Sequence, residues 1–254
     1  MSWAARRRLI IALIIGGVGI AFSTTIFLKT FYEAPSCIDR VQNQDEEGID
    51  CGGSCPYLCT AQEQPPTVLF TKAITNSEGR TDIIASVGNK NSGVAAKNVP
   101  YRVQLYSADR VLIKEVTGVL DLPPGATVPI YVPGVLTGKQ TITGVFLSIE
   151  ASSPQWFKMV TDSRVIPMVS GTKQSGTVST PRIETVLANP SAIPLTNVLV
   201  IVLVRNDRGD VIAASRTIVA TIPAQGQTPA TFTWNSAFPS APTSIEIVPI
   251  IPLP

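Results

Sequence analysis

Four cysteines lie within 23 residues, at positions 37, 51, 55 and 59, and the rest of the sequence has none. Outside the cytoplasm, such a cluster favours two disulfides among Cys37, Cys51, Cys55 and Cys59. A segment this short cannot bury a hydrophobic core, so covalent links must hold it together. Three ways of pairing the cysteines are possible, and the spacing does not choose among them.

The same segment offers two other kinds of chemistry. Zinc is a competing ligand for the cysteines, but their spacing of thirteen, three and three intervening residues is not the Cys-x-x-Cys pairing of zinc ribbons. Hard oxygen ligands for calcium are also present, and the candidates are Asp39, Asp45 and Asp50. These residues do not follow the EF-hand spacing, and a solvated acidic loop is the simpler interpretation of the carboxylates.

The composition excludes several classes of enzyme. Among 254 residues there is no histidine, which removes the Ser–His and Cys–His catalytic pairs and the usual ligands of zinc enzymes. The net charge is +2, basic residues are scattered beyond the N-terminus, and no glycine-rich phosphate loop follows a predicted strand. We therefore expect no catalytic residue, no cofactor and no nucleic-acid partner.

The cysteine segment resembles a known motif of surface proteins. Its pattern Cys-x-Asp, then Asn-x-Asp-Glu-x-Gly-x-Asp-Cys-Gly-Gly-x-Cys, occupies residues 37–55. This is similar to the short "DCGG" cysteine-rich motif of bacterial and archaeal surface proteins. The resemblance implies an extracytoplasmic setting and a disulfide-bonded loop, and it implies no activity.

An apolar segment near the N-terminus predicts a membrane anchor. Residues 9–28 carry no formal charge, and three arginines at 6–8 precede them. Twenty helical residues span the roughly 30 Å hydrocarbon core of a bilayer, and the arginines favour a cytoplasmic N-terminus. A cleaved signal peptide is the alternative, but its apolar core runs about 7–15 residues, so we expect an uncleaved single-pass helix. Everything beyond Lys29 is then extracytoplasmic, in a periplasm or on the cell surface.

The remainder of the chain contains an internal repeat with an offset of 99 to 101 residues. Asn89 in the first copy matches Asn189 in the second, and Leu122-Pro123 matches Ile222-Pro223. Self-similarity this sustained indicates one fold used twice.

The repeated fold is predicted to be β. Val99, Tyr101, Val103 and Leu105 alternate with other residues, as in a strand with one buried face. Short strands punctuated by turn residues favour an antiparallel β-sandwich. The other predicted strands are 67–73, 82–88, 110–116, 126–132, 141–149, 164–169, 177–188, 197–205, 210–221, 228–234 and 243–249.

Each repeat also resembles Ig-like sandwiches that carry a Phe-x-Leu-Tyr-Asp signature. Residues 103–107, Val-Gln-Leu-Tyr-Ser, fit it with Val for Phe and Ser for Asp, while residues 204–207 of the second repeat lack the tyrosine. The resemblance implies a mainly β chain with two tandem Ig-like sandwiches, and it says little about function. The predicted boundaries are 1–8 for a cytosolic N-terminus, 9–28 for the helix, 29–66 for the cysteine-rich module and linker, and 67–152 and 153–254 for the two domains.

One strand of the second repeat is apolar on both faces. Leu199, Ile201 and Leu203 stand where the first repeat has Pro, Arg and Gln. A sandwich strand needs only one apolar face, so something must cover these three side chains. Either Trp156-Phe157 or a loop covers them from within, or a partner subunit docks there. We take the three residues as the candidate partner-binding surface and Trp156 and Phe157 as the domain junction.

These features together predict a non-enzymatic, membrane-anchored envelope protein. Its exoplasmic domains would mediate protein–protein interaction or form a structural subunit of a surface assembly, with a protein partner or a second copy of the chain. The alternative is a module that binds a glycan or a small ligand, which requires an exposed aromatic cluster with convergent polar groups.

Overall fold

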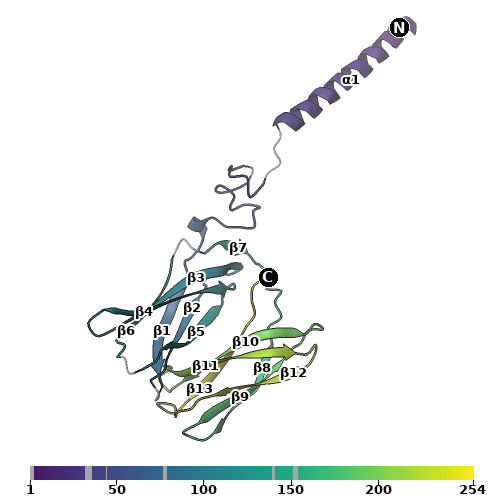
Figure 1. The fold of residues 1–254 in the computed structure, drawn as a ribbon. Helices are drawn as coiled ribbons and strands as arrows, with labels where there is room; N and C mark the ends of the chain where they lie inside the picture. The colour runs from purple at the N-terminus through teal and green to yellow at the C-terminus, as the bar shows by residue number, and fades with distance from the viewer. Residues whose placement is uncertain (1–2, 32–35, 44, 77–78, 139–140, 151–153) are drawn as a thin grey trace. The chain divides into compact units, whose positions relative to one another are not determined.

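The computed structural model describes residues 3–31, 36–43, 45–76, 79–138, 141–150 and 154–254 (Figure 1). The chain divides into two compact units, Met1–Cys55 and Pro56–Pro254, and each is described by itself. The predicted boundary between the two β domains, at residues 152 and 153, lies outside the described residues.

The first unit begins with a long apolar helix, α1 (Trp3–Phe31). It extends past the predicted 9–28 at both ends and includes the three arginines. Among the described residues, α1 is the one helix that is both long enough and apolar enough to cross a membrane. Its most apolar 18 residues have a mean hydropathy of 2.3. None of that stretch is buried by protein. A helix that is apolar all round and uncovered suits a lipid surface or the apolar part of a signal sequence.

The rest of the first unit, residues 36–55, is a loop without regular strands. Its backbone turns through left-handed conformations at Arg40 (φ 63°), Asp50 (φ 56°), Gly52 (φ 79°) and Gly53 (φ 49°). A Cβ atom at Gly53 would collide with the carbonyl oxygen of Asp45, so only glycine fits there. The Gly-Gly pair therefore makes a tight turn between Cys51 and Cys55.

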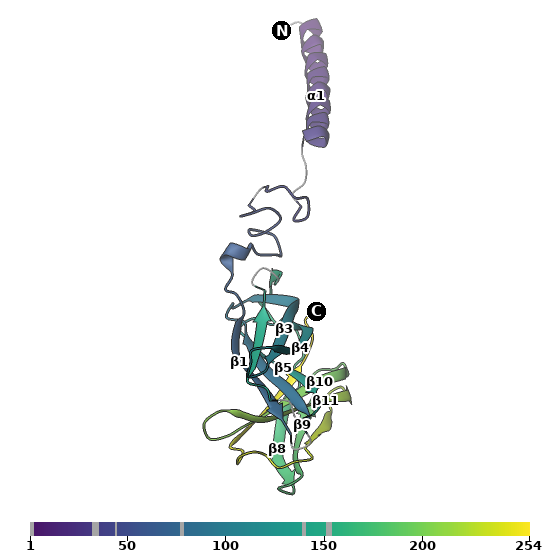
Figure 2. The ribbon, with the colours of Figure 1, turned by 60° about the vertical axis from the view of Figure 1, so that its left-hand side comes forward.

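The second unit starts with a 3-10 turn, η1 (Thr60–Gln62), and continues as β structure in which every strand pair is antiparallel. The strands before residue 160 form two sheets that face each other, and we call this pair the first sandwich (Figures 1 and 2). One sheet has the order β1 (Thr67–Thr75), β2 (Thr81–Gly88), β5 (Thr127–Leu136), and the other has the order β4 (Leu112–Leu122), β3 (Val94–Tyr106), β6 (Gly144–Ile149), with β7 (Trp156–Lys158) also on β3.

The second sandwich has the same strand order as the first. One sheet is β8 (Met168–Gly176), β9 (Pro181–Ala188), β12 (Gln227–Thr233), and the facing sheet is β11 (Val211–Ile222), β10 (Leu195–Arg205), β13 (Ser244–Ile250). Together with α1 and the disulfides, these sheets confirm the prediction of a mainly β chain with one N-terminal helix.

Each sandwich has its own hydrophobic core. In β3, Val103 and Leu105 are completely buried and alternate with side chains that are not, as the period-two pattern predicts. In β10, Val200, Val202 and Val204 point into the second core. Because each sandwich encloses a separate apolar cluster, each has its own source of folding energy.

Two strands differ from the sequence-based expectation. The strand predicted at 164–169 lies further along the chain, as β8 at Met168–Gly176. This strand lies at a sheet edge, its side chains are mostly polar and exposed, and it has no apolar period to recognise. The second difference is β7, three residues long, which no periodicity can predict.

Candidate functional site

All four cysteines lie in the described residues and none is free. Cys37 is bonded to Cys55, and the other two cysteines, Cys51 and Cys59, are also disulfide-bonded. The predicted disulfides are therefore present. The structure also selects one of the three pairings that the sequence leaves open.

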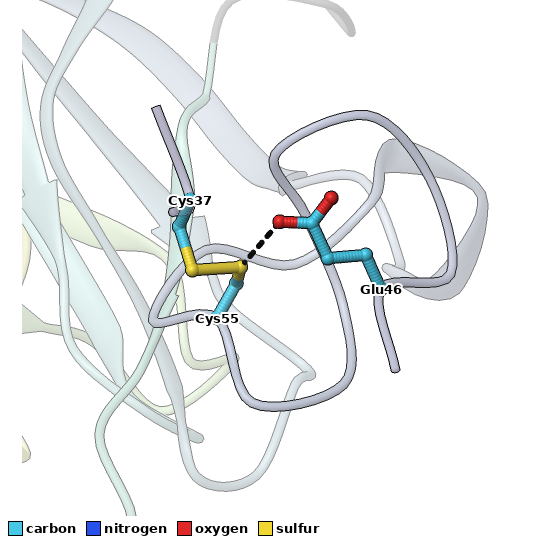
Figure 3. A group of neighbouring side chains, drawn as sticks. All are labelled: Cys37, Glu46 and Cys55. Carbon is cyan, nitrogen blue, oxygen red and sulfur yellow. Dashed lines mark hydrogen bonds between the residues drawn. A yellow bond between two sulfur atoms is a disulfide. The ribbon is translucent and has the colours of Figure 1, made fainter. Parts of the chain in front are cut away.

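The buried side chain of Glu46 lies against the Cys37–Cys55 disulfide (Figure 3). Its Oε1 is 3.1 Å from Cys55 Sγ, and its Oε2 accepts hydrogen bonds from the backbone N–H groups of Asn43 (3.3 Å) and Asp50 (3.2 Å). The ligand atoms of Cys37, Glu46 and Cys55 lie within 4.8 Å of one another. However, cysteine binds zinc as a thiolate, and both sulfurs are committed to the disulfide, so the oxidised loop does not offer these cysteines to a zinc ion.

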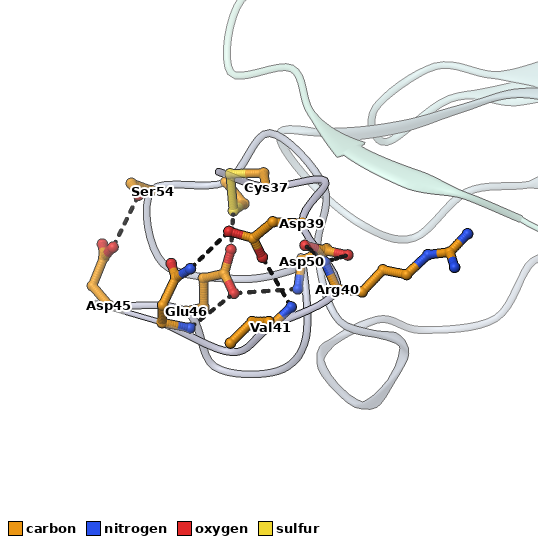
Figure 4. Close-up of a disulfide and its surroundings, with 10 residues drawn as sticks. Cys37, Asp39, Arg40, Val41, Asp45, Glu46, Asp50 and Ser54 are labelled. Atoms are coloured by element: carbon orange, nitrogen blue, oxygen red, sulfur yellow. Dashed lines mark hydrogen bonds between the residues drawn. A yellow bond between two sulfur atoms is a disulfide. The ribbon is translucent and has the colours of Figure 1, made fainter. Parts of the chain in front are cut away.

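The three calcium candidates each serve the loop itself (Figure 4). Asp39 accepts hydrogen bonds from the Val41 N–H (2.9 Å) and from the side chain of Asn43, and both oxygens of Asp50 lie 3.0 Å from the Arg40 N–H. Asp45 accepts from the Ser54 hydroxyl at 2.9 Å. In the described part of the chain these carboxylates do not form one group of potential ligands. They stabilise turns, including the left-handed residue Arg40.

The apolar outer face of β10 is covered by the first sandwich. Ile201 (3% exposed) and Leu203 (2% exposed) form a third hydrophobic cluster with Ile84 of β2 and Tyr131 of β5. Leu199 is half-buried at the edge of the same cluster. The cover is thus part of the same chain, and it is a sheet face rather than the segment 156–157 or a loop. We assign Ile201 and Leu203 to this inter-sandwich contact instead of to a partner surface.

Trp156 and Phe157 do not lie between the two sandwiches. They belong to β7, which pairs with β3 through Ala96 and Ala95. Trp156 is 4% exposed and contributes to the core of the first sandwich, while Phe157 packs against a small cluster that includes Ala95. They extend a sheet of the first sandwich, which differs from the predicted junction.

The last residues of the chain return to the first sandwich. Leu253 is 3% exposed and packs with Ala95 and Met159. Its backbone N–H donates to Asp121 Oδ2 (2.8 Å), and the Lys97 ammonium donates to the carbonyl oxygen of Pro254 (3.0 Å). Residues 251–254 therefore form a strap across the two sandwiches.

A groove of about 570 Å³ opens beside the inter-sandwich contact. We call it the inter-sandwich groove. The first sandwich lines it with side chains from β3, β4 and β5, and the second with side chains from β10, β11 and β13. Its apolar lining includes Val119, Ile130, Leu199, Ile201, Val248 and Ile250, and its polar side chains include Asn98, Tyr101, Asp121, Arg164 and Arg216.

The polar side chains of this groove differ in whether they have ion-pair or hydrogen-bond partners. Arg164 pairs with Asp162 (2.7 Å) and donates to the Ile251 carbonyl oxygen (2.6 Å). Asp121 accepts two backbone hydrogen bonds, from Asn98 and from Leu253. By contrast, Arg216 forms no ion pair or side-chain hydrogen bond with the described residues.

Tyr101 lies in the electrostatic range of Arg216. Burial raises the pKa of the Tyr101 phenol, and the positive charge of Arg216 opposes that rise. Gly118 pairs with Tyr101 across β3 and β4, and a Cβ there would collide with the phenol ring. The missing side chain leaves room for the ring to lie across β4.

An aromatic pair lines a second, open pocket of about 510 Å³ in the first sandwich. The rings of Tyr106 and Phe146 meet edge to face, with their centroids 5.9 Å apart, and Phe146 is 61% exposed. Gln104, Arg110 and Thr143 surround them. The exposed ring of Phe146 and the half-buried ring of Tyr106 thus have polar neighbours.

Comparison with known proteins assigns the chain to no family. No protein-family model matches it, and no curated protein does. Among solved structures it is similar to red sea bream transglutaminase, at 11% sequence identity and a TM-score of 0.26. The similarity covers 73% of this chain and 29% of that chain, so the chain spans less than a third of the transglutaminase.

Proposed function

We propose that the chain is a non-enzymatic, membrane-anchored envelope protein. Its extracytoplasmic sandwiches bind another protein or form a structural subunit of a surface assembly. The observation that carries this proposal is α1, an apolar helix with exposed side chains, followed in the same chain by disulfide-bonded cysteines. A bilayer would cover the helix, and disulfides persist in oxidising compartments.

The arrangement of the β structure supports a mechanical or docking role. The two sandwiches share a buried apolar cluster, and residues 251–254 strap them together. Such contacts hold the two sandwiches at one angle, which suits a spacer or a presenting surface. The absence of histidine from the whole sequence removes the Ser–His and Cys–His catalytic pairs, which favours a non-enzymatic role.

Membrane extraction tests the anchor. We expect the full chain to stay in the membrane fraction after alkaline washing. Replacing Ile14 and Ile15 with Arg should release it, because each arginine costs about 2.5–3.5 kcal/mol at the centre of a bilayer helix. The matched control places arginine at Val160 and Ile193, two exposed apolar residues of the second unit, and should stay anchored. Release of the unmodified chain, shortened at its N-terminus, would identify α1 as a cleaved signal sequence.

Crosslinking in intact cells tests the interaction. We expect crosslinks from the full chain to one recurring neighbour, or to a second copy, at a consistent set of surface residues. The crosslinked peptides are identified by mass spectrometry. If only random neighbours are recovered, the proposed interaction is wrong. The proposed membrane anchor does not depend on this result.

Glycan binding is the second candidate, favoured by the exposed ring of Phe146 against the half-buried ring of Tyr106. Sugar rings stack on aromatic faces, and the neighbouring Gln104 and Thr143 could hydrogen-bond their hydroxyls. Screening of the full chain on a glycan array should then give a signal that Phe146→Ala abolishes. The control is Ile218→Ala, an equally exposed apolar residue on another sheet.

A further inference from the structure

We propose that the inter-sandwich groove binds an elongated apolar carboxylic acid, with the carboxylate beside Arg216. The groove is separate from the loop and helix that support the proposed function. Its volume of about 570 Å³ falls in the range of small-molecule pockets, about 300–1,000 Å³. Such pockets are lined mainly by apolar side chains with a few placed polar groups, as this groove is.

Arg216 is the candidate anion-binding group of the groove. Arg164 is neutralised by Asp162, and Asp121 is bound by two backbone N–H groups. Arg216 is left as a cation without an ion-pair partner among the described residues. A guanidinium binds a carboxylate through two parallel hydrogen bonds, and this geometry favours a carboxylate over a neutral head group.

The apolar part of the ligand has a surface to cover. Leu199 is half-buried, and its cross-strand neighbour Ile218 on β11 is 64% exposed. Across the groove, Val119 of β4 is 61% exposed, and Ile166 is 48% exposed. The outer face of this sheet therefore continues past the part that the first sandwich covers. A chain or ring lying along Leu199 would remove this remaining apolar surface from water.

Tyr101 offers a second polar group in the same groove. Its side chain and that of Arg216 both line the groove. A phenol O–H donates to a carboxylate, so Tyr101 and Arg216 together offer a neutral and a charged donor. This pair places the head group on the β11 side of the groove and the apolar part toward Leu199 on β10 and Val248 on β13.

Photolabelling of the full chain tests the site. The chain is placed in discs of zwitterionic phosphatidylcholine and irradiated with 4-benzoylbenzoate, a rigid apolar ketone with one carboxylate. Labelled peptides are mapped by mass spectrometry, which separates the groove from any labelling of α1. We expect saturable labelling of the strands that carry Val119 and Val248. The neutral methyl ester should label these strands about tenfold more weakly.

Two variants and one control decide the outcome. Arg216→Gln should weaken the apparent affinity about tenfold, because it removes a charged hydrogen bond. Val119→Trp should abolish labelling by filling the groove, while thermal unfolding shows that the chain still folds. Arg208→Gln, at an exposed turn arginine, should change nothing. The proposal is overturned if the groove strands are not labelled, or if they are labelled equally in Arg216→Gln and the unmodified chain.

Discussion

Two buried asparagines make the same contacts in the two sandwiches. Asn89 and Asn189 are 3% and 2% exposed. The side-chain amide of Asn89 donates to the carbonyl oxygens of Val94, Leu122 and Pro123, and that of Asn189 donates to the three equivalent carbonyls. The sequence repeat matches the two residues to each other, but it does not predict their contacts. Their role became visible once three separate segments met around each amide.

Replacing Asn89 with Ala should destabilise the first sandwich. The substitution leaves buried carbonyl groups without donors, which costs about 1–3 kcal/mol for each unsatisfied group. We expect the free energy of unfolding to fall by at least about 2 kcal/mol, measured by urea denaturation of the detergent-solubilised chain. Asn189→Ala should act equally on the second sandwich, and Asn235→Ala, at an exposed position, should have little effect. An unchanged midpoint in Asn89→Ala would show that water replaces the amide.

Tyr131 makes the stability of the chain sensitive to alkaline pH. Its hydroxyl donates to Asp82 Oδ2 at 2.6 Å. Burial, followed by this hydrogen bond and the nearby carboxylate charge, raises the pKa of the phenol well above its ordinary value of 10.0. Above pH 10 the unfolded chain therefore releases a proton that the folded chain keeps. The free energy of unfolding must then fall as the pH rises.

The variant Tyr131→Phe should flatten this alkaline decline. Denaturation at pH 8 and pH 11 gives the change in unfolding free energy for each chain. We expect a smaller loss between the two pH values in Tyr131→Phe than in the unmodified chain. Tyr57→Phe, at an exposed position, is the control. Identical losses in all three chains would place the ionising group elsewhere.

Among the elements, β10 shows that the sequence can identify a strand with two apolar faces without identifying the segments that pack against it. Strand periodicity predicts one inward and one outward face, and β10 has large aliphatic residues on both. The sequence therefore predicts correctly that Ile201 and Leu203 must be covered. It cannot identify the cover, because Ile84 and Phe70 lie more than a hundred residues away and only the folded chain brings them to β10.

The strap formed by residues 251–254 is also an element with a measurable role. Leu253 is almost completely buried against Ala95 and Met159. Leu253→Ala should cost about 2–5 kcal/mol in the stability of this contact, through lost apolar burial and the cavity left behind. Hydrogen exchange at the backbone of β3 and β7 should become faster. Pro254→Ala, at an exposed side chain, is the control.

If exchange in β7 is unaffected by Leu253→Ala, the strap does not stabilise the first sandwich. Exchange in β12 provides an internal reference, because β12 pairs with β9 and lies outside the Leu253 cluster.

For the second unit as a whole, the arrangement of the two sandwiches depends on a third apolar cluster. Each sandwich has its own core, and the contact between them adds Ile201, Leu203 and Ile84. Lys72 also donates to the Val211 carbonyl oxygen at 2.8 Å, and the Arg205 guanidinium lies 5.6 Å from the centre of the Phe70 ring. Since the cores are separate, we expect the contact to break without unfolding either sandwich.

Leu203→Asp should separate the two sandwiches while each stays folded. An unpaired carboxylate in the cluster is strongly unfavourable, because it loses its water. Spin labels placed on the two sandwiches should report a broad distance distribution in place of a narrow one, measured by pulsed electron paramagnetic resonance. Ile218→Asp, at a 64% exposed position on the same sheet, is the matched control and should keep the narrow distribution.

Loss of the far-ultraviolet circular dichroism signal in Leu203→Asp would mean that the second sandwich depends on the contact. A narrow distribution in that variant would mean that the strap and the polar contacts alone hold the arrangement.

The amino-acid sequence determined the features that depend on near neighbours. The uncharged stretch 9–28 is enough for a long apolar helix, and alternation along residues 99–105 is enough for a half-buried strand. Four clustered cysteines predict disulfides because a short segment has no other means of holding its shape.

The tertiary structure alone decided which segments meet. It selected the pairing of Cys37 with Cys55 and placed Trp156 in the first core. It also placed Arg216 and Tyr101 in the lining of one groove that neither sandwich forms alone. These outcomes depend on contacts between residues far apart in the chain. Local pattern carries no information about such contacts, because a polar or apolar side chain has the same sequence signature whatever it faces.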